Sequence, residues 1–365
     1  MSRGLTRLLF IGPDHGSAVG GREQLSRLHR RALGDLLGDR IETFFLPRRA
    51  LSGAAALLAV VSGRIDGTDR GTEELVLARI ADRAIDTVWL DGSNLGVLAH
   101  TIKRQFPKIN VVTFFHNVEA RFFLGALRHK PGVRALAVLA ANYTAERMAV
   151  RSSHRLITLT RRDGDLLKAL YGRDATDLLP MAIEDHAALV GVGNGAVPEA
   201  NFLLFVGGGF YANRAGILWF AREVAPNIDL QLCVVGRGLD DLRCELDATP
   251  NVRLVGAVDD LRPWYQHSKA VIAPIFDGSG MKTKVAEALM YGKPVIGTRE
   301  SFAGYDDVAE QAGWRAETPA DWIATIEGLT GKSRPAFDPS LRRLYVERYS
   351  RDAAMSRISA ILEVG

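Results

Sequence analysis

The sequence predicts an α/β protein of two domains, each a Rossmann-like, doubly wound parallel sheet with helices on both faces. Three observations support this fold class. Short apolar runs alternate with helical patterns along the whole chain, as is typical of parallel sheets. The 365 residues, of which 47% are hydrophobic, exceed the usual size of one domain. A stretch rich in Pro and Gly, residues 178–201, interrupts the alternation and indicates a linker.

The apolar runs, which are bounded by turn residues, are expected to be strands. In the first part of the chain they are RLLFI (7–11), IETFFL (41–46), DTVWLD (86–91), INVVTFF (109–115) and RLITLT (155–160). After the linker they are NFLLFVG (201–207), LQLCVVG (230–236), VRLVG (252–256), AVIAPI (270–275) and PVIGT (294–298). We therefore expect a first domain over residues 1–185, a linker over 186–200 and a second domain over 201–345.

Composition excludes several classes of protein. The two cysteines, Cys233 and Cys244, supply neither a disulfide framework nor a four-ligand zinc site, which favours a reducing cytosol. No apolar stretch approaches the roughly 18 residues of a membrane span, and the N-terminal run is too short for a signal peptide. Aromatic residues make up 8% of the chain and form no basic-aromatic stripe, so a nucleic-acid partner is not expected. We expect a cytoplasmic protein.

Two glycine-rich connections follow predicted strands. One contains Gly20 and Gly21, and the other contains Gly208. In parallel sheets ligands gather beyond the carboxyl ends of the strands, and glycine lets backbone N–H groups approach a phosphate closely. Such loops are also ordinary turns. The second connection fits neither a strict dinucleotide fingerprint nor a nucleotide-triphosphate loop.

The strongest candidate site is APIFDGSGMKTKVAEALMYGKPVIGT, residues 273–298, which reads as a strand, a small-residue loop and a helix. We expect the helix to begin at Ser279 and Gly280, so that the N–H groups from Ser279 to Lys282 face an anion such as a diphosphate. Lys282 is expected to bind the phosphate. Lys284, two residues further on, is expected to reach solvent or to pair with a carboxylate.

Glu287 lies further along the same helix, among apolar residues. It is therefore expected to be semi-buried and to need partners. A carboxylate at this position suits a pair of vicinal hydroxyls, as in a ribose. The alternative for the whole segment is a helix-capping loop with ordinary surface charges.

This segment resembles the donor-nucleotide signature of the GT-B glycosyltransferases, in particular glycosyltransferase family 4. Further stretches match in the same order over nearly the whole chain: the early GG (20–21), FHNVEARFF (115–123), TLTRRDGDLL (158–167), LLPMAIE (178–184), LLFVGGGFYANRAGILWF (203–220), VVGRG (234–238), VRLVGAVDDL (252–261) and VERYSRDAAMSRISAIL (346–362). The resemblance implies two Rossmann-like domains that face each other across a cleft. It also implies that a final helix, about 346–365, packs back on the first domain.

The resemblance also assigns roles to individual residues. Glu287 would hold the ribose, and His116 would reach the transferred sugar from the first domain. The region around Val258 would line the base pocket. The loop would hold the diphosphate through Ser279, Gly280, Met281, Lys282 and Thr283.

The sequence departs from the family pattern at two places. The common signature has two glutamates eight positions apart, and Ser279 stands where the first is expected, so a retaining outcome is not implied. The arginine and lysine that commonly clamp the diphosphate after the first strand of the second domain are also absent. Asn213 and Arg214 occupy that loop. We expect Lys282 and Arg214 to compensate.

The chemistry needs a stabilised leaving group and a base near the acceptor hydroxyl. Backbone donors and a lysine meet the first need without a metal or other cofactor. The only Asp-any-Asp match, Asp163 with Asp165, is better interpreted as a helix cap. Candidate bases are His116, Glu119 and Asp91, all at or beyond strand ends. His116 could also be a structural histidine.

The predicted function is a glycosyltransferase that moves a sugar from a nucleotide-diphosphate sugar to an acceptor hydroxyl, in polysaccharide or glycolipid synthesis. A nucleotide-sugar epimerase and a non-catalytic nucleotide-sugar-binding protein of the same fold are the alternatives. The acceptor is expected to be a saccharide or a lipid-linked saccharide. Residues 48–64 and 121–134 combine apolar and basic side chains and are candidates for contact with the inner membrane surface at the cytoplasmic face, although core packing explains the first equally well.

Overall fold

The chain folds into two compact units. The computed structural model describes residues 6–14, 20–47, 62–129, 131–187, 197–198, 201–278, 280–330 and 337–363. Unit 1 comprises the chain up to Pro180 together with Ala354 onward, and unit 2 comprises Met181–Ala353. The expected linker, 186–200, falls mostly on residues outside those described.

Unit 1 contains a parallel sheet of six strands in the order β2-β1-β3-β4-β5-β6. The strands are β1 (Leu8–Pro13), β2 (Ile41–Leu46), β3 (Thr87–Leu90), β4 (Asn110–Phe115), β5 (Arg155–Thr158) and β6 (Asp177–Leu178). β3 is buried along its whole length because helices cover both faces of the sheet.

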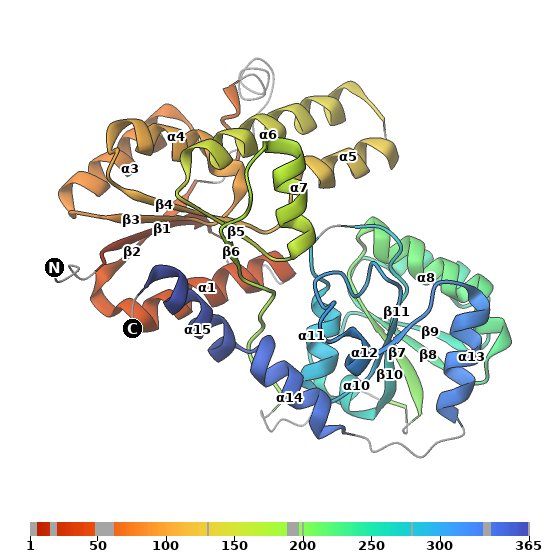
Figure 1. Ribbon diagram of the computed structural model, residues 1–365. Coiled ribbons are helices and arrows are strands. Elements are labelled where there is room, and N and C mark those ends of the chain that lie inside the picture. The colour runs from red at the N-terminus through yellow and green to blue at the C-terminus, as the bar shows by residue number, and fades with distance from the viewer. Residues whose placement is uncertain are drawn as a thin grey trace. The chain divides into compact units, whose positions relative to one another are not determined.

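The helices of unit 1 divide between the two faces of this sheet. They are α1 (Gly21–Leu37), α3 (Arg70–Asp82), α4 (Gly96–Gln105), α5 (Glu119–His129), α6 (Val133–Ser152), α7 (Arg161–Tyr171) and α15 (Arg351–Leu362), with short 3-10 turns η1 (Gly38–Arg40) and η2 (Ser93–Leu95). Figure 1 shows α1 and α15 on one face and α3, α4 and α6 on the other. Val76 of α3 and Leu98 of α4 pack in one cluster with Leu9 and Val88 of the sheet.

Unit 2 repeats the architecture with the strand order β12-β11-β10-β7-β8-β9, again all parallel. The strands are β7 (Phe202–Val206), β8 (Leu232–Val235), β9 (Val252–Gly256), β10 (Ser268–Ala273), β11 (Val295–Gly297) and β12 (Gly313–Arg315). The helices are α8 (Tyr211–Glu223), α9 (Arg243–Leu246), α10 (Arg262–His267), α11 (Thr283–Met290), α12 (Ala309–Ala312), α13 (Pro319–Thr330) and α14 (Pro339–Arg348), with the 3-10 turns η3 (Ala225–Asn227) and η4 (Asp240–Leu242).

Alternate residues of β7 pack on opposite faces of the unit 2 sheet. Leu203 joins a hydrophobic cluster that includes Phe220 of α8 and Trp322 of α13. Phe202 points to the other face, where its ring lies edge-on to Trp264 of α10, with 6.1 Å between ring centroids. A strand buried on both faces reads as a continuous apolar run rather than an alternating one, which is the pattern FLLFV shows.

The strand orders fix where ligands are expected. In unit 2 the chain winds outward on both sides of its first strand, so the direction of winding reverses between β7 and β10. In unit 1 the reversal lies between β1 and β3. Ligands of doubly wound sheets bind at such switch points, beyond the carboxyl ends of the two strands. The loops after these four strands are therefore the places to search for a site.

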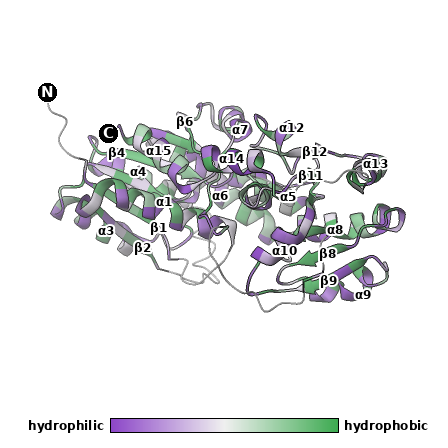
Figure 2. Ribbon diagram, turned by 90° about the horizontal axis from the view of Figure 1, so that it is seen from below, coloured by the Kyte–Doolittle hydropathy of each residue, from purple (hydrophilic) through white to green (hydrophobic). Residues whose placement is uncertain are grey.

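The predicted fold class is confirmed, and all ten predicted strands are present. Figure 2 shows their apolar character, with β8 and β9 coloured mostly as hydrophobic. Two strands, β6 and β12, were not predicted. They contain two and three residues, which is too short for a periodic pattern, and they form because β5 and β11 offer an edge to pair with.

The close contact between α4 and α6 depends on Gly96. A Cβ atom at this position would lie 1.7 Å from the carbonyl oxygen of Ala145 and 2.5 Å from the nitrogen of Ala149. Gly96→Ala is expected to lower the free energy of unfolding by about 1–3 kcal/mol or more, measured by urea denaturation. Gly34→Ala is the control, because nothing lies within 4 Å of its Cβ position. In the α1 interior it should raise stability by about 0.4–1 kcal/mol. Equal effects of the two substitutions would contradict the packing argument.

Candidate functional site

The site in unit 2 lies at the switch point between β7 and β10. α8 follows β7 and approaches the loop after β10 so closely that a Cβ atom on Gly216 would lie 1.7 Å from the carbonyl oxygen of Pro274. The glycine-rich loop after β7 is fixed by Asn213, whose Nδ2 donates to the carbonyl oxygen of Gly208 at 2.9 Å. The loops after the two strands are therefore held side by side.

Lys284 links these two segments. It lies in the first turn of α11 and is buried. Its Nζ donates to Oδ1 of Asn213 at 2.8 Å and lies 4.2 Å from the centroid of the Phe205 ring. Burial lowers its pKa to about 7, with the charge of Glu287 opposing the shift. Among the described residues, no carboxylate forms an ion pair with it.

The expectation for Lys284, contact with solvent or with a carboxylate, is therefore wrong. α11 is covered on most sides, and its neighbours Val285 and Ala286 are buried as well. The amine of a lysine on such a helix cannot reach solvent, so it binds polar atoms of the segments that pack against the helix. The expectation that Lys282 and Lys284 face different ways is confirmed, since Lys282 binds other partners.

Lys282 is engaged with a carboxylate. Its Nζ lies 2.9 Å from Oε1 of Glu300 and 3.0 Å from the carbonyl oxygen of Gly280. Both side chains of this ion pair are mostly buried. For Lys282 to bind a phosphate, the anion must join or replace Glu300.

The start of the helix differs from the expectation. α11 begins at Thr283, with Lys282 in an extended conformation as its N-cap, rather than at Ser279 and Gly280. Gly280 has φ +64°, a left-handed conformation that cannot continue a helix and that favours glycine. The N–H donors of the first turn therefore begin at Thr283. Ser279 lies outside the described residues. Met281 is buried, and its Sδ lies 3.2 Å from the nitrogen of Met181.

Glu287 is partly buried and has a partner, as expected. Tyr265 of α10 donates its hydroxyl hydrogen to Oε2 of Glu287 at 2.6 Å. Burial raises the pKa of Glu287, and the Tyr265 hydrogen bond and the charge of Lys284 oppose that shift. The Tyr265 ring stacks on that of Tyr291, with centroids 4.8 Å apart. The carboxyl group is thus held in one orientation.

The remaining residues predicted to bind the donor lie at other places. Arg214 makes two hydrogen bonds to the carboxylate of Asp241, so its guanidinium is already engaged. Val258 is partly buried and lies just beyond β9. Gly20 and Gly21 are the N-cap and first residue of α1, in unit 1.

Unit 1 brings two of the three predicted catalytic residues into contact. Asp91 follows β3 and His116 follows β4. His116 Nε2 lies 3.0 Å from Oδ1 of Asp91, and both side chains are buried. Ser26 of α1 donates to Oδ2 of the same carboxylate at 2.5 Å. The last residues of β1 also come close, since a Cβ atom on Gly12 would lie 3.0 Å from Cβ of Asp91.

The charge state of Asp91 fixes the imidazole tautomer. Burial alone would raise the pKa of Asp91, but the charge of His116 and the hydrogen bonds from His116 and Ser26 outweigh it and hold the pKa well below its usual range. The ionised carboxylate of Asp91 therefore accepts the hydrogen bond from His116, so Nε2 of His116 must carry the hydrogen. In a neutral ring, Nδ1 is then the acceptor. It is buried and has no hydrogen-bond partner among the described residues.

Aromatic rings surround this pair. Phe114 lies edge-on to His116 with 4.8 Å between centroids, and edge-on to His29 at 4.6 Å. Burial lowers the pKa of His29 to about 3, although the charge of Asp91 opposes this. His29 is consequently neutral at ordinary pH. The hydrogen bonds to Asp91 come from His116 and Ser26.

Glu119, the third candidate, begins α5. Its side chain lies 3.6 Å from Nη1 of Arg22. Burial raises its pKa to about 7, with Arg22 lowering it and the charge of Glu146 raising it. Glu146 itself accepts the N–H groups of Glu119 and Ala120 and the hydroxyl of Tyr171, so it caps α5. A carboxyl group with a pKa near 7 can give or take a proton at neutral pH.

Other sequence expectations concern metals and membranes. Asp163 belongs to a helix cap, as expected, because Thr160 accepts from its N–H and donates to its Oδ2. Within the described part of the chain, no group of three or more His, Cys, Asp or Glu is arranged to hold a metal ion. In the same residues, no helix is long and apolar enough to cross a bilayer.

The roles of several site residues were not predicted from the sequence. For Lys284 one pattern in the sequence was informative: it precedes Glu287 by three residues, so the two share a helix face. No sequence pattern links Ser26 or Tyr265 to its carboxylate partner, because the partners lie 65 and 22 residues away in the chain. Only the strand order brings such distant segments together.

Comparisons with known proteins bear on the fold and on the sequence family of the second unit. The family described as Glycosyl transferases group 1 matches residues 200–331. Sucrose-phosphate synthase from Thermosynechococcus elongatus is similar in structure over 98% of both chains, with a TM-score of 0.69 and 15% identity. HepE from Anabaena, solved in complex with UDP, has a TM-score of 0.67 and 14% identity over 98% of this chain and 100% of its own.

A third similar structure is the lipopolysaccharide outer core galactosyltransferase WaaB, with a TM-score of 0.66 and 14% identity over 98% of this chain and 99% of its own. A search of curated proteins found no match. The resemblance is confirmed at this level: residues 200–331 match the family model, and the chain has the same fold as these three structures.

Proposed function

We propose that the chain transfers a sugar from a nucleotide-diphosphate sugar to an acceptor hydroxyl, in polysaccharide or glycolipid synthesis and without a metal ion or other cofactor. The group 1 match over residues 200–331 supports the transfer of a sugar. The similar HepE structures were solved with UDP and with UDP-glucose, which supports a nucleotide-sugar donor. The comparisons do not favour the alternative of an epimerase or a non-catalytic binding protein.

The observation that carries this proposal is the buried amine of Lys284. An ammonium group without an anionic partner is costly to bury, and its lowered pKa reflects that cost. A diphosphate would supply the missing charge. The N–H groups at the start of α11 and the adjacent Lys282 add further donors on the same loop. Together they would stabilise the negative charge of the leaving nucleotide.

Glu287 is proposed to hold the ribose. Tyr265 fixes one carboxylate oxygen, and a carboxylate has acceptor capacity beyond one hydrogen bond. Vicinal hydroxyls present two donors at the spacing of two carboxylate oxygens. Val258, beyond β9, is proposed to line the base pocket.

His116 and Asp91 are proposed to act on the acceptor. With Nε2 bound to Asp91, the Nδ1 lone pair of His116 can accept a hydrogen from a hydroxyl. Because Nδ1 is buried, the sugar must displace the side chains that cover it. Asp91 keeps the tautomer and stabilises the imidazolium that forms when the proton is taken. Glu119, with its pKa near 7, is the second candidate for this role.

Membrane contact is proposed for the start of α6. Val133 is 87% exposed and Leu136 is 56% exposed, and the basic Arg128 and Arg134 are exposed beside them in sequence. Apolar side chains flanked by arginines suit the surface of an anionic bilayer that carries a lipid-linked acceptor. The other expected segment, residues 48–64, lies almost entirely outside the described residues.

Lys284→Met is expected to weaken UDP binding about ten- to a hundredfold, through loss of a charge-assisted hydrogen bond of roughly 1.5–3 kcal/mol. In the native protein, UDP affinity should fall as pH rises above about 7, because the neutral amine must take up a proton when the anion binds. The variant should lose this dependence. Titration calorimetry in buffers of different ionisation enthalpy measures both the affinity and the proton uptake.

Lys282→Met is the matched control, because Lys282 already has Glu300 as a partner. It should keep the pH dependence. Unchanged affinity in Lys284→Met would remove Lys284 from the donor site, and unchanged affinity in Lys282→Met would do the same for Lys282. A native protein that binds none of the UDP, GDP, ADP and CMP sugars would overturn the proposed function.

Asp91→Asn is expected to lower kcat for nucleotide release from the donor about 10²- to 10⁴-fold, with donor affinity unchanged, because the base loses its orientation and its counter-charge. His116→Ala should have a similar effect. Asp86→Asn, at the opposite end of β3, should remain within about twofold of the native rate. If both site variants keep their rate and Glu119→Gln loses it, the base is Glu119.

Flotation with liposomes tests the membrane contact. The native protein should float with vesicles rich in phosphatidylglycerol at low salt, and Val133→Ser together with Leu136→Ser should reduce the floated fraction. High salt should also reduce it, since surface charges are screened. Leu75→Ser is the control, because Leu75 is another exposed leucine in unit 1, on α3. No binding at low salt would exclude the proposed contact.

A further inference from the structure

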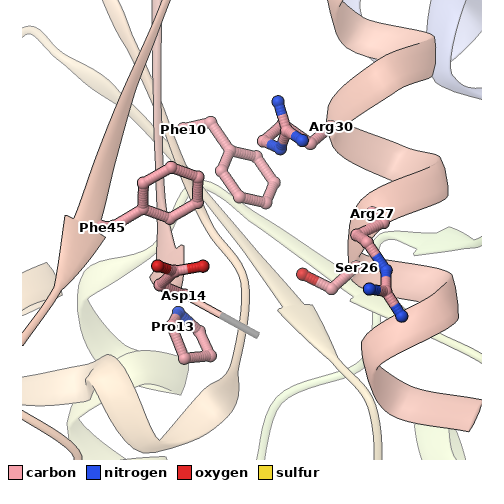
Figure 3. Close-up of a pocket in the computed structure, with 7 residues that line it drawn as sticks. All are labelled: Phe10, Pro13, Asp14, Ser26, Arg27, Arg30 and Phe45. Carbon is pink, nitrogen blue, oxygen red and sulfur yellow. The ribbon is translucent and has the colours of Figure 1, made fainter. Parts of the chain in front are cut away.

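A small cavity lies beside the Asp91–His116 pair in unit 1. It has a volume of about 90 Å³ and lies between α1 and the carboxyl ends of β1 and β2. Figure 3 shows Ser26, Arg27 and Arg30 on the α1 side, and Asp14 and Phe45 among the side chains of the strands opposite. None of these side chains has a role in the donor site of unit 2.

The lining of the cavity is positively charged. Arg27 and Arg30 are three residues apart on α1 and therefore share a face of the helix. Among the described residues that line it, Asp14 is the only carboxylate, so two positive charges face one negative charge. The Arg30 guanidinium lies 5.8 Å from the centroid of the Phe45 ring. This contact restricts Arg30 to the cavity wall.

The size of the cavity limits what it can hold. Pockets that enclose a whole drug-sized ligand have volumes of about 300–1,000 Å³, and this one is several times smaller. It therefore suits one substituent of a larger molecule. Phe45 is 46% exposed, and an exposed aromatic face at the rim can pack against the rest of that molecule.

Ser26 connects the cavity to the reactive pair. Its hydroxyl lines the cavity and donates to Oδ2 of Asp91, while Oδ1 of the same carboxylate binds His116. A substituent in the cavity is thus separated from the Asp91 carboxylate by a single side chain.

We propose that this cavity binds a phosphoryl group of the acceptor, so that the acceptor is a phosphorylated saccharide. The inference rests on the proposed function. One arginine satisfies both oxygens of a planar carboxylate, whereas the three free oxygens of a phosphoryl group can engage two guanidinium groups and, when it turns away from Asp91, the Ser26 hydroxyl. Asp14 then accepts from a sugar hydroxyl.

The test measures binding of glucose 1-phosphate, glucose and glucuronate in the presence of saturating UDP, which occupies the donor site. We expect glucose 1-phosphate to bind at least tenfold more tightly than the other two compounds. Arg27→Gln and Arg30→Gln should each weaken its binding at least tenfold and leave UDP binding unchanged. Arg31→Gln is the matched control, because Arg31 is exposed on the same helix and does not line the cavity.

Three results would overturn the inference: equal binding of glucose 1-phosphate by the native and the Arg27→Gln and Arg30→Gln proteins, equal loss in Arg31→Gln, or equal affinity for glucuronate. Failure of the proposed function is distinguishable, because it would appear as a native protein that binds none of the UDP, GDP, ADP and CMP sugars or releases no nucleotide from them, whereas the three results above concern binding of glucose 1-phosphate alone. A glucose diphosphate linked to a short prenyl chain identifies the source of the phosphate. Tighter binding of this compound than of glucose 1-phosphate assigns a lipid-linked acceptor, and equal or weaker binding assigns a free sugar phosphate.

Discussion

Unit 2 depends on one constraint: the Lys284 amine is buried, and no described carboxylate forms an ion pair with it. The Lys284 ammonium is fixed by Asn213 from α8 and by the face of Phe205 from β7. Both contacts come from the segments that meet at the winding reversal of the sheet. A cation–π contact and one neutral acceptor return only part of the desolvation free energy. An anion bound at Lys284, as proposed, would supply the rest.

Unit 1 uses the opposite arrangement. Its central charge is the Asp91 carboxylate, which is satisfied on both oxygens by Ser26 and His116. This carboxylate therefore needs no further partner. On the proposed assignments, unit 2 presents a cation with no anionic partner among the described residues, and unit 1 presents a base whose acceptor nitrogen has no donor among them. The different winding reversals, between β1 and β3 and between β7 and β10, place each group at the same relative position in its sheet.

Much of the fold was predictable because both sheets are buried on two faces. Strands such as β3 and β8 then read as continuous apolar runs, which a single sequence reveals. Contacts between distant segments were not predictable. The burial of Lys284 depends on α8 lying against the loop after β10, and the late start of α11 depends on the left-handed backbone of Gly280. For Asp91 and His116 the sequence could predict only that they lie near each other, because both follow neighbouring strands. It could not predict the hydrogen bond between them.

Ser26 has a consequence for the timing of the reaction. A hydroxyl has one hydrogen to give, and Asp91 accepts it in this structure. An oxyanion in the cavity competes for that hydrogen. The carboxylate would then lose one of the hydrogen bonds that keep its pKa low and would become a stronger base toward the imidazole. Binding of the acceptor would thereby activate His116, the proposed base that deprotonates it. Without a bound acceptor the protein would hydrolyse less of its donor.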